Sequence, residues 1–230
     1  LDQILVSVKQ LVIPNNTPKV FIIGLPRTGT TSVCAAFLSL GYKTAHTAYT
    51  RKCITQAQAI ADTPVFCDYQ RLDVMYPGSK FVYLNRGLDT WLPSIRQLLA
   101  RMYQNLQRSD GGFNPHLKRC YNEVFHPLTS ENIASDLFLT NCFNNHQRSV
   151  YQYFSARPND ILTIDVSVPS SLSSLIKFLG VEASAIIDTD TKPIQFEKMN
   201  IGGKVTAWNK IKHQLKVEST NNGRIDTILY

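Results

Sequence analysis

Cysteine pairs are missing from this sequence, and so are long apolar runs. The five cysteines are an odd number, and no two of them form a C-x-x-C pair. This pattern argues against a disulfide framework or a zinc site and favours a reducing compartment, so we expect a cytoplasmic protein. No stretch approaches the roughly 18 apolar residues of a membrane-spanning helix, and no signal peptide is visible. We therefore expect no membrane segment in this chain.

Charged residues are scarce, and no long basic run occurs. Only 18% of the 230 residues are charged, whereas 43% are hydrophobic, which argues against disorder and provides for a sizeable core. The formal net charge of +7 suits an anionic ligand. Because the basic residues are not gathered in runs, the charge does not indicate nucleic-acid binding.

Three apolar runs, rich in β-branched residues, are each followed by a segment with helical periodicity. The predicted strands span residues 19–25, 79–86 and 160–166. The predicted helices span residues 30–41, 89–106 and 170–180. Strands that alternate with helices predict an α/β fold, in which a central parallel sheet is flanked by helices.

Residues 107–158 contain no clear strand. Helices are expected there around residues 117–126 and 130–154. We interpret this region as a helical cap beside the site, inserted in a single domain that spans residues 1–230. The cap contains aromatic residues that either line an apolar pocket or fill its core: Phe113, Tyr121, Phe125, Phe138 and Phe143.

The segment "FIIGLPRTGTTSV" (residues 21–33) places a glycine-bounded loop between the first strand and the first helix. Gly24 and Gly29 permit a tight path, and such a loop points backbone N–H groups into one concavity at the positive end of a helix. Arg27 adds a charged donor, and the loop is followed by hydroxyls on Thr30, Thr31 and Ser32. The pattern predicts a seat for phosphate or sulfate. The alternative is an ordinary strand-to-helix turn with capping threonines.

The loop lacks the lysine that nucleotide-hydrolysing P-loops place directly after the second glycine. Thr30 occupies that position, and no predicted strand ends in a clear metal-binding aspartate. Asp165 comes nearest, but it is more simply explained as a residue at the end of a strand. These absences weigh against a metal site and against a P-loop small-molecule kinase, which stays as an alternative function.

With its cation before the second glycine, "LPRTGTTS" resembles the 5′-phosphosulfate loop of the sulfotransferases that use PAPS (3′-phosphoadenosine 5′-phosphosulfate). That loop typically reads P-[KR]-[ST]-G-T-[TS], and the matching residues are Pro26, Arg27, Thr28, Gly29, Thr30 and Thr31. The resemblance implies PAPS as co-substrate and in-line transfer of a sulfuryl group to a hydroxyl or amine of a small-molecule or glycan acceptor. It implies neither a metal nor a covalent enzyme intermediate. Arg27 is the candidate to neutralise charge at the bridging oxygen.

A second motif, "YLNRGLDTWLPS" (residues 83–94), supports this resemblance. Arg86 ends a predicted strand, and Ser94 lies eight residues later on the next helix. An arginine and a hydroxyl so placed grip one phosphate from two sides, and the same separation resembles the family's 3′-phosphate motif. The alternative is a surface cation and a serine on a helix face.

A third segment, "NIGGKVTAW" (residues 200–208), partly resembles the R-K-G-x-x-G-D-W segment that closes over the 3′-phosphate in this family. Gly203 and Trp208 match, but uncharged residues stand where arginine and lysine would be, which leaves Lys204 as the nearest cation. We assign Gly203 and Lys204 to the donor site; a glycine-rich loop before a surface helix is the alternative. The departure from the family pattern keeps a non-catalytic phosphoadenosine-binding protein as another alternative function.

Sulfuryl transfer also needs a group that accepts the proton of the acceptor. In the family this base is a histidine or a carboxylate, on a stretch that precedes the arginine–serine strand and lies close to a proline. Here that stretch is "IADTPVFCDY", and Asp62, two residues before Pro64, is the preferred base. His46 in "YKTAHTAY" is the second candidate and Asp68 the third. The alternative for Asp62 is a helix cap or turn residue.

Overall fold

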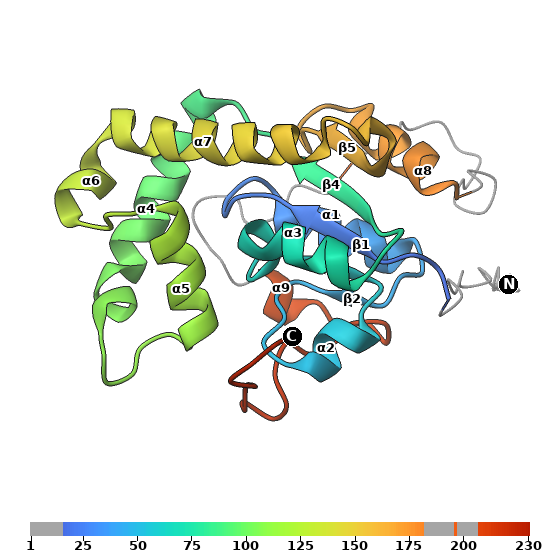
Figure 1. The fold of residues 1–230 in the computed structure, drawn as a ribbon, viewed down its shortest axis with the longest axis horizontal. Coiled ribbons are helices and arrows are strands. Elements are labelled where there is room, and N and C mark those ends of the chain that lie inside the picture. Colours follow the sequence, from blue (N-terminus) through green and yellow to red (C-terminus); the bar gives the residue numbers. More distant parts are fainter. Residues whose placement is uncertain (1–15, 182–195, 197–206) are drawn as a thin grey trace, which may run out of the picture.

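The computed structural model describes residues 16–181, 196 and 207–230. Through this part of the chain runs a five-stranded parallel sheet with the order β2-β3-β1-β4-β5 (Figure 1). Its strands are β1 (Val20–Ile23), β2 (Thr44–Ala45), β3 (Ala59–Ala61), β4 (Lys80–Leu84) and β5 (Ile161–Ile164). The predicted α/β class with a central parallel sheet is confirmed.

Helices fill the connections between the strands, because parallel strands need long crossovers. Those beside the sheet are α1 (Thr30–Ser39), α2 (Arg51–Gln56), α3 (Val65–Met75), α8 (Ser171–Leu179) and the short α9 (Ala207–Lys210). Between β4 and β5 lie α4 (Leu88–Gln107), α5 (Pro115–Val124), α6 (Ser130–Ala134), α7 (Asp136–Phe154) and a 3-10 turn (Pro158–Asp160). No helix within the described ranges is both long and apolar enough to cross a membrane.

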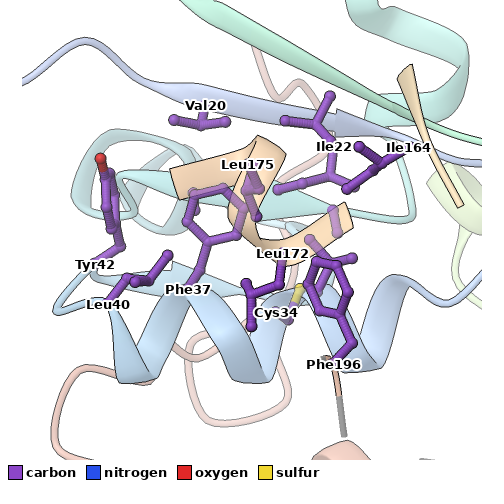
Figure 2. Packing of buried hydrophobic residues seen from close by; sticks show 14 of the residues in the cluster. Val20, Ile22, Cys34, Phe37, Leu40, Tyr42, Ile164, Leu172, Leu175 and Phe196 are labelled. Atoms are coloured by element: carbon purple, nitrogen blue, oxygen red, sulfur yellow. The ribbon is translucent and has the colours of Figure 1, made fainter. Parts of the chain in front are cut away.

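The alternation of side chains along β1 divides the core into two layers. Val20 and Ile22 pack on the face covered by α1 and α8, where Phe37 joins them (Figure 2). Phe21 and Ile23 pack on the opposite face with residues of α3 and the end of α7. Each large apolar side chain that is fully buried stabilises the fold by about 1.5–3 kcal/mol. The strand that leads into the predicted anion loop is therefore held firmly from both sides.

The cap is built on the far half of α4, which extends away from the sheet (Figure 1). The cap aromatics belong to one hydrophobic cluster, in which Tyr121, Phe125 and Phe143 are buried and Phe113 and Phe138 pack against them. Of the two expectations for these residues, the structure shows the second: they fill the core of the cap.

The helix predicted at residues 130–154 is in fact two helices. Ser135 follows α6, and its hydroxyl accepts a hydrogen bond from the Phe138 N–H at 3.2 Å as the N-cap of α7. A serine that bonds nearby backbone N–H groups competes with a continuous helix, which explains the break. The other helix predicted in the cap is present as α5, where the Asn114 side chain accepts from the Leu117 N–H at 3.0 Å.

Candidate functional site

The loop between β1 and α1 takes a path that only glycine permits at two positions. A Cβ atom on Gly24 would lie 2.5 Å from Thr28 Oγ1, and one on Gly29 would lie 2.6 Å from Val166 Cγ2. Gly29 also has a φ of 105°, which L side chains rarely adopt. The Thr28 hydroxyl donates to the Leu25 carbonyl at 2.7 Å and closes the loop on itself. The loop is thus a tight cradle of backbone atoms.

The first turn of α1 lies at the mouth of this cradle. It contains three buried hydroxyl residues, each at most 6% exposed: Thr30, Thr31 and Ser32. No acidic residue of α1 lies in this turn, and no side chain caps the helix. The first N–H groups of a helix lack intrahelical partners and attract anions. The helix start therefore offers both N–H and hydroxyl donors to an anion.

Arg27 links the two phosphate motifs that the sequence predicts. Its Nε donates to Ser94 Oγ at 2.8 Å, and its carbonyl oxygen accepts from Arg86 Nη1 at 2.6 Å. Trp91 adds a further tie, because its indole N–H donates to the Pro26 carbonyl at 3.0 Å. β1 and β4 are neighbours in the sheet, so the segments that follow them meet at the same edge. The structure brings both motifs into one site.

Positive charge is concentrated around Arg27. Burial lowers the pKa of Arg27, and the nearby charges of Arg86 and Arg101 lower it further. Within the described residues, neither Arg27 nor Arg86 forms an ion pair with a carboxylate. Arg27 also has a left-handed backbone with a φ of 74°, which costs a residue other than glycine about 1–3 kcal/mol and tends to cluster at functional sites. A bound anion would offset both the burial and the mutual repulsion.

His46 lies just after β2 and contacts the first turn of α1. Its Nε2 is 3.1 Å from Thr30 Oγ1 and 3.1 Å from Thr31 Oγ1. The imidazole stacks on Trp208, with ring centroids 5.5 Å apart and an interplanar angle of 30°. His46 therefore contacts the start of α1 directly, which its position in the sequence did not reveal.

Asp62 follows β3 and faces His46. Its Oδ2 lies 3.9 Å from His46 Nε2, whereas its Oδ1 accepts from the Thr63 N–H at 2.8 Å and from the Thr63 hydroxyl at 3.2 Å. The φ of Asp62 is 55°, a left-handed turn conformation that aspartate tolerates. One carboxylate oxygen thus serves the turn, and the other faces the histidine.

The surroundings of His46 disfavour its protonated form. Burial lowers the pKa of His46, Asp62 partly opposes this effect, and Lys216 lowers the pKa further. The Lys216 Nζ also lies 5.0 Å from the centroid of the Trp208 ring on which His46 stacks. The imidazole is therefore neutral near pH 7, and which of its nitrogens carries the proton decides how it contacts the threonines.

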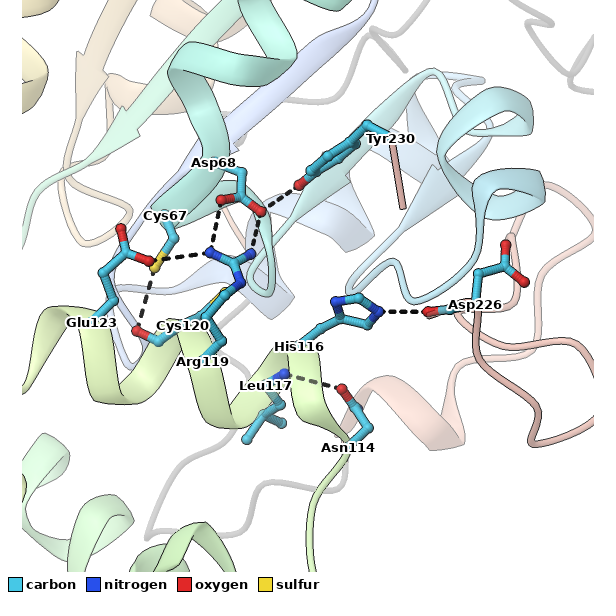
Figure 3. A network of polar contacts seen from close by, with 10 residues as sticks. All are labelled: Cys67, Asp68, Asn114, His116, Leu117, Arg119, Cys120, Glu123, Asp226 and Tyr230. Carbon is cyan, nitrogen blue, oxygen red and sulfur yellow. Dashed lines mark hydrogen bonds and ion pairs between the residues drawn. The ribbon is translucent and has the colours of Figure 1, made fainter. Parts of the chain in front are cut away.

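Asp68, the third candidate base, is engaged outside the site (Figure 3). Arg119 on α5 donates to both carboxylate oxygens, at 3.0 and 2.5 Å, and the Tyr230 hydroxyl donates to one of them. His116, on the same helix, donates to the Asp226 carbonyl at 2.6 Å. These contacts fasten α5 to α3 and to the C-terminal segment, so Asp68 anchors the cap.

Two predicted donor-binding residues, Gly203 and Lys204, lie outside the described residues. Conversely, the sequence did not point to Arg101 or Lys216, whose charges act on the site. Arg101 carries a signal in retrospect, because it follows Ser94 by seven residues and so lies two turns along the same helix face. Lys216 has no motif around it and reaches the site only through the path of the C-terminal segment.

Together, the fold and the site define an α/β protein in which a glycine-bounded loop precedes a helix at the carboxyl edge of a parallel sheet, beside two arginines. Residues 19–52 and 47–202 match the family model of the sulfotransferase domain. The chain belongs to this family, whose domain supports sulfuryl transfer and makes the protein a transferase. No match was found among curated proteins.

Proposed function

We propose that the protein transfers a sulfuryl group from PAPS to a hydroxyl or amine of a small-molecule or glycan acceptor. The observation that carries the proposal is the pair of hydrogen bonds from Arg27 to Ser94 and from Arg86 to the Arg27 carbonyl. Arg27 belongs to the motif for the 5′-phosphosulfate, and the other two residues belong to the motif for the 3′-phosphate. A donor with anionic groups at both its 5′ and 3′ positions suits a site in which these motifs touch.

The residues around the loop fit such a donor. The tight turns at Gly24 and Gly29 let backbone N–H groups approach the phosphosulfate closely, whereas a bulkier residue at either position would prevent this approach. We assign the phosphosulfate to these N–H groups, to Arg27 and to the hydroxyls of Thr30, Thr31 and Ser32. We assign the 3′-phosphate to Arg86 and Ser94, and to Gly203 and Lys204 from their sequence pattern alone.

In the proposed reaction, one bond to sulfur forms as another breaks. The acceptor oxygen or nitrogen forms a bond to sulfur while the bond between sulfur and the bridging oxygen breaks, and its electrons stay on the 5′-phosphate. Arg27 stabilises the charge that develops on the bridging oxygen. Asp62 Oδ2 takes the proton of the acceptor, because the other oxygen of this carboxylate is occupied by Thr63. His46 remains the alternative base.

Two measurements test the proposal. Calorimetric titration with 3′-phosphoadenosine 5′-phosphate (PAP), the product of the donor, should give tight binding without magnesium, whereas ATP with magnesium should bind weakly. The reverse order would favour a small-molecule kinase. An acceptor screen with sulfur-labelled PAPS should then show label on a hydroxyl or amine compound. PAP binding without transfer to any acceptor class would favour a non-catalytic phosphoadenosine-binding protein.

A further inference from the structure

One tyrosine of the cap core has an unpaired hydroxyl close to the proposed base. We propose that Tyr121, on α5, binds the acceptor: its hydroxyl forms a hydrogen bond with the reacting hydroxyl or amine while Asp62 takes the proton of that group. The inference deepens the proposed function and rests on it. It gives the cap a direct part in holding the acceptor, in addition to the packing of its aromatic core.

The Tyr121 side chain is buried except at its polar end. The residue is only 4% exposed, and its ring packs edge-on against Phe66, with ring centroids 5.9 Å apart. Within the described ranges, no hydrogen bond pairs the Tyr121 hydroxyl. The unpaired polar atoms that are fully enclosed in this part of the chain belong to Tyr83, Arg96 and His146. Because the Tyr121 hydroxyl is unpaired but not enclosed, the small exposed part of this residue includes its hydroxyl.

Contacts between α3 and α5 place Tyr121 next to the proposed base. The Cys67 thiol, in the first turn of α3, donates to the Cys120 carbonyl at 3.3 Å, and Tyr121 follows directly (Figure 3). The same turn of α3 is joined to the base, because the Phe66 N–H donates to the Asp62 carbonyl at 3.3 Å. One turn of α3 thus holds both the carboxylate and the tyrosine.

The charges around the Tyr121 hydroxyl agree with this placement. Burial raises the pKa of Tyr121 well above its ordinary value, the charge of Asp62 raises it further, and Arg27 lowers it. Tyr121 in turn acts on the pKa of Arg27. The hydroxyl therefore lies within electrostatic reach of the residue assigned to the bridging oxygen and of the residue assigned to the proton. It stays protonated at neutral pH, so it can both donate and accept.

A second tyrosine near the proposed base has its partners within the protein. Tyr49 is also buried, and burial raises the pKa of its hydroxyl, whereas the nearby side chains of Asn114, Thr63 and Thr47 act as hydrogen-bonding partners and lower it. Buried tyrosine hydroxyls usually find such a partner. The Tyr121 hydroxyl has none among the described residues, so we assign the acceptor to it.

Tyr121→Phe tests the inference on the full chain, because it removes the hydroxyl and keeps the ring. The probe is the compound that takes most label from PAPS in a screen of phenols, alcohols, glycans and amines. The kcat/KM for this compound should fall roughly 3- to 10-fold, as the loss of one hydrogen bond predicts. The loss should appear in the KM for the acceptor and not in the KM for PAPS. PAP affinity and the melting temperature should stay unchanged, because PAP contains no acceptor group and the hydroxyl has no partner among the described residues.

Tyr103→Phe provides the matched control, because Tyr103 packs against the same cap cluster. This variant should keep wild-type kinetics. Wild-type kinetics in Tyr121→Phe, or an equal loss in Tyr103→Phe, would overturn the inference and leave the proposed function intact. A loss in Tyr121→Phe that comes with weaker PAP binding or a lower melting temperature would show a structural role and would also overturn it. Absence of transfer by the wild-type protein to any compound would overturn the proposed function and the inference together.

Discussion

Arg27 Nε donates to Ser94 Oγ at 2.8 Å across 67 positions of the sequence. The bond joins the loop after β1 to the second turn of α4, and the Trp91 indole ties α4 to the same loop through the Pro26 carbonyl. Contacts within the protein therefore join the two motifs. Donors that the protein holds in place need little reorganisation when charge develops beside them, and such electrostatic stabilisation is usually the largest single contribution to catalysis.

Arg86→Ala should weaken PAP binding more than binding of adenosine 5′-phosphosulfate, which has no 3′-phosphate. The loss of a charge-assisted contact predicts roughly 1.5–3 kcal/mol for PAP. In addition, both ligands should lose a smaller amount of binding free energy, because Arg86 also donates to the Arg27 carbonyl and supports the loop. The difference between the two ligands, measured by calorimetry, isolates the 3′-phosphate contact. Equal losses would show that Arg86 only supports the loop.

Sulfuryl transfer should proceed without a divalent metal. Under the proposed function, the charge of the donor is balanced by Arg27, the loop N–H groups and the hydroxyls at the start of α1, in place of the magnesium that nucleotide-hydrolysing loops use. Label transfer from PAPS should be the same in EDTA as in magnesium. Activity that disappears in EDTA and returns with magnesium would contradict the assignment and favour the kinase alternative.

Asp62→Asn should lower kcat by roughly 10²–10⁴, the usual contribution of general base catalysis, and leave PAP affinity nearly unchanged. The amide oxygen of asparagine can still accept from the Thr63 N–H and hydroxyl, so the turn and the melting temperature should be preserved. His46→Gln provides the comparison. Wild-type turnover in Asp62→Asn beside an inactive His46→Gln variant would transfer the role of base to the histidine.

Acid should destabilise the fold through His146. This buried ring donates from Nε2 to the Phe66 carbonyl at 2.8 Å, and burial lowers its pKa from 6.5 to about 4. Because the folded pKa is below the unfolded one, the contribution of the neutral ring is complete above pH 6.5 and is lost as the pH falls toward 4. The shift corresponds to a few kcal/mol, at about 1.4 kcal/mol per pKa unit.

Urea unfolding between pH 7 and pH 4 measures this effect. His146→Gln keeps an N–H donor for the Phe66 carbonyl but does not titrate, so its free energy of unfolding should fall less steeply with acid than that of the wild type. Parallel curves for the two proteins would show that other groups cause the acid sensitivity.

Arg119→Met should loosen the cap. It leaves the Asp68 carboxylate, whose side chain is only 10% exposed, with a single hydroxyl partner on Tyr230. Because Arg119 is itself 43% exposed, we expect a loss of roughly 1–3 kcal/mol, below the cost of breaking a fully buried pair. In chemical unfolding, adding Asp68→Asn to the variant should cost little more. Additive losses would mean that the two side chains act independently.

Elements with a strong local pattern could be predicted from the sequence, whereas β2 and β3 could not. β1, β4 and β5 each contain four or five residues, most of them apolar and either β-branched or aromatic. In contrast, β2 (Thr44–Ala45) and β3 (Ala59–Ala61) are only two and three residues long and contain alanine. Such short, alanine-containing strands exist because neighbouring strands pair with them. Intrinsic strand propensity is too weak to define them.

The candidate site divides in the same way. The tight path of the loop between β1 and α1 was predictable because Gly24, Arg27 and Gly29 lie close together in sequence and dictate a local conformation. The contact of His46 with Thr30 and Thr31 depends on how the segments after β2 and β1 meet across the sheet, which no local pattern encodes. The contribution of Lys216 depends on the C-terminal segment returning beside β2, where the Val217 N–H donates to the Thr44 carbonyl.

Helix α4 runs without interruption from the segment after β4 into the cap (Figure 1). Ser94 lies near its first end and Leu106, within the cap core, near its last, so twelve residues separate them by about 18 Å. Under the proposed function, one end of this helix therefore holds a hydroxyl of the donor site while the other end packs in the cap core. A single helix thus connects the packing of the cap to the position of a donor-binding side chain.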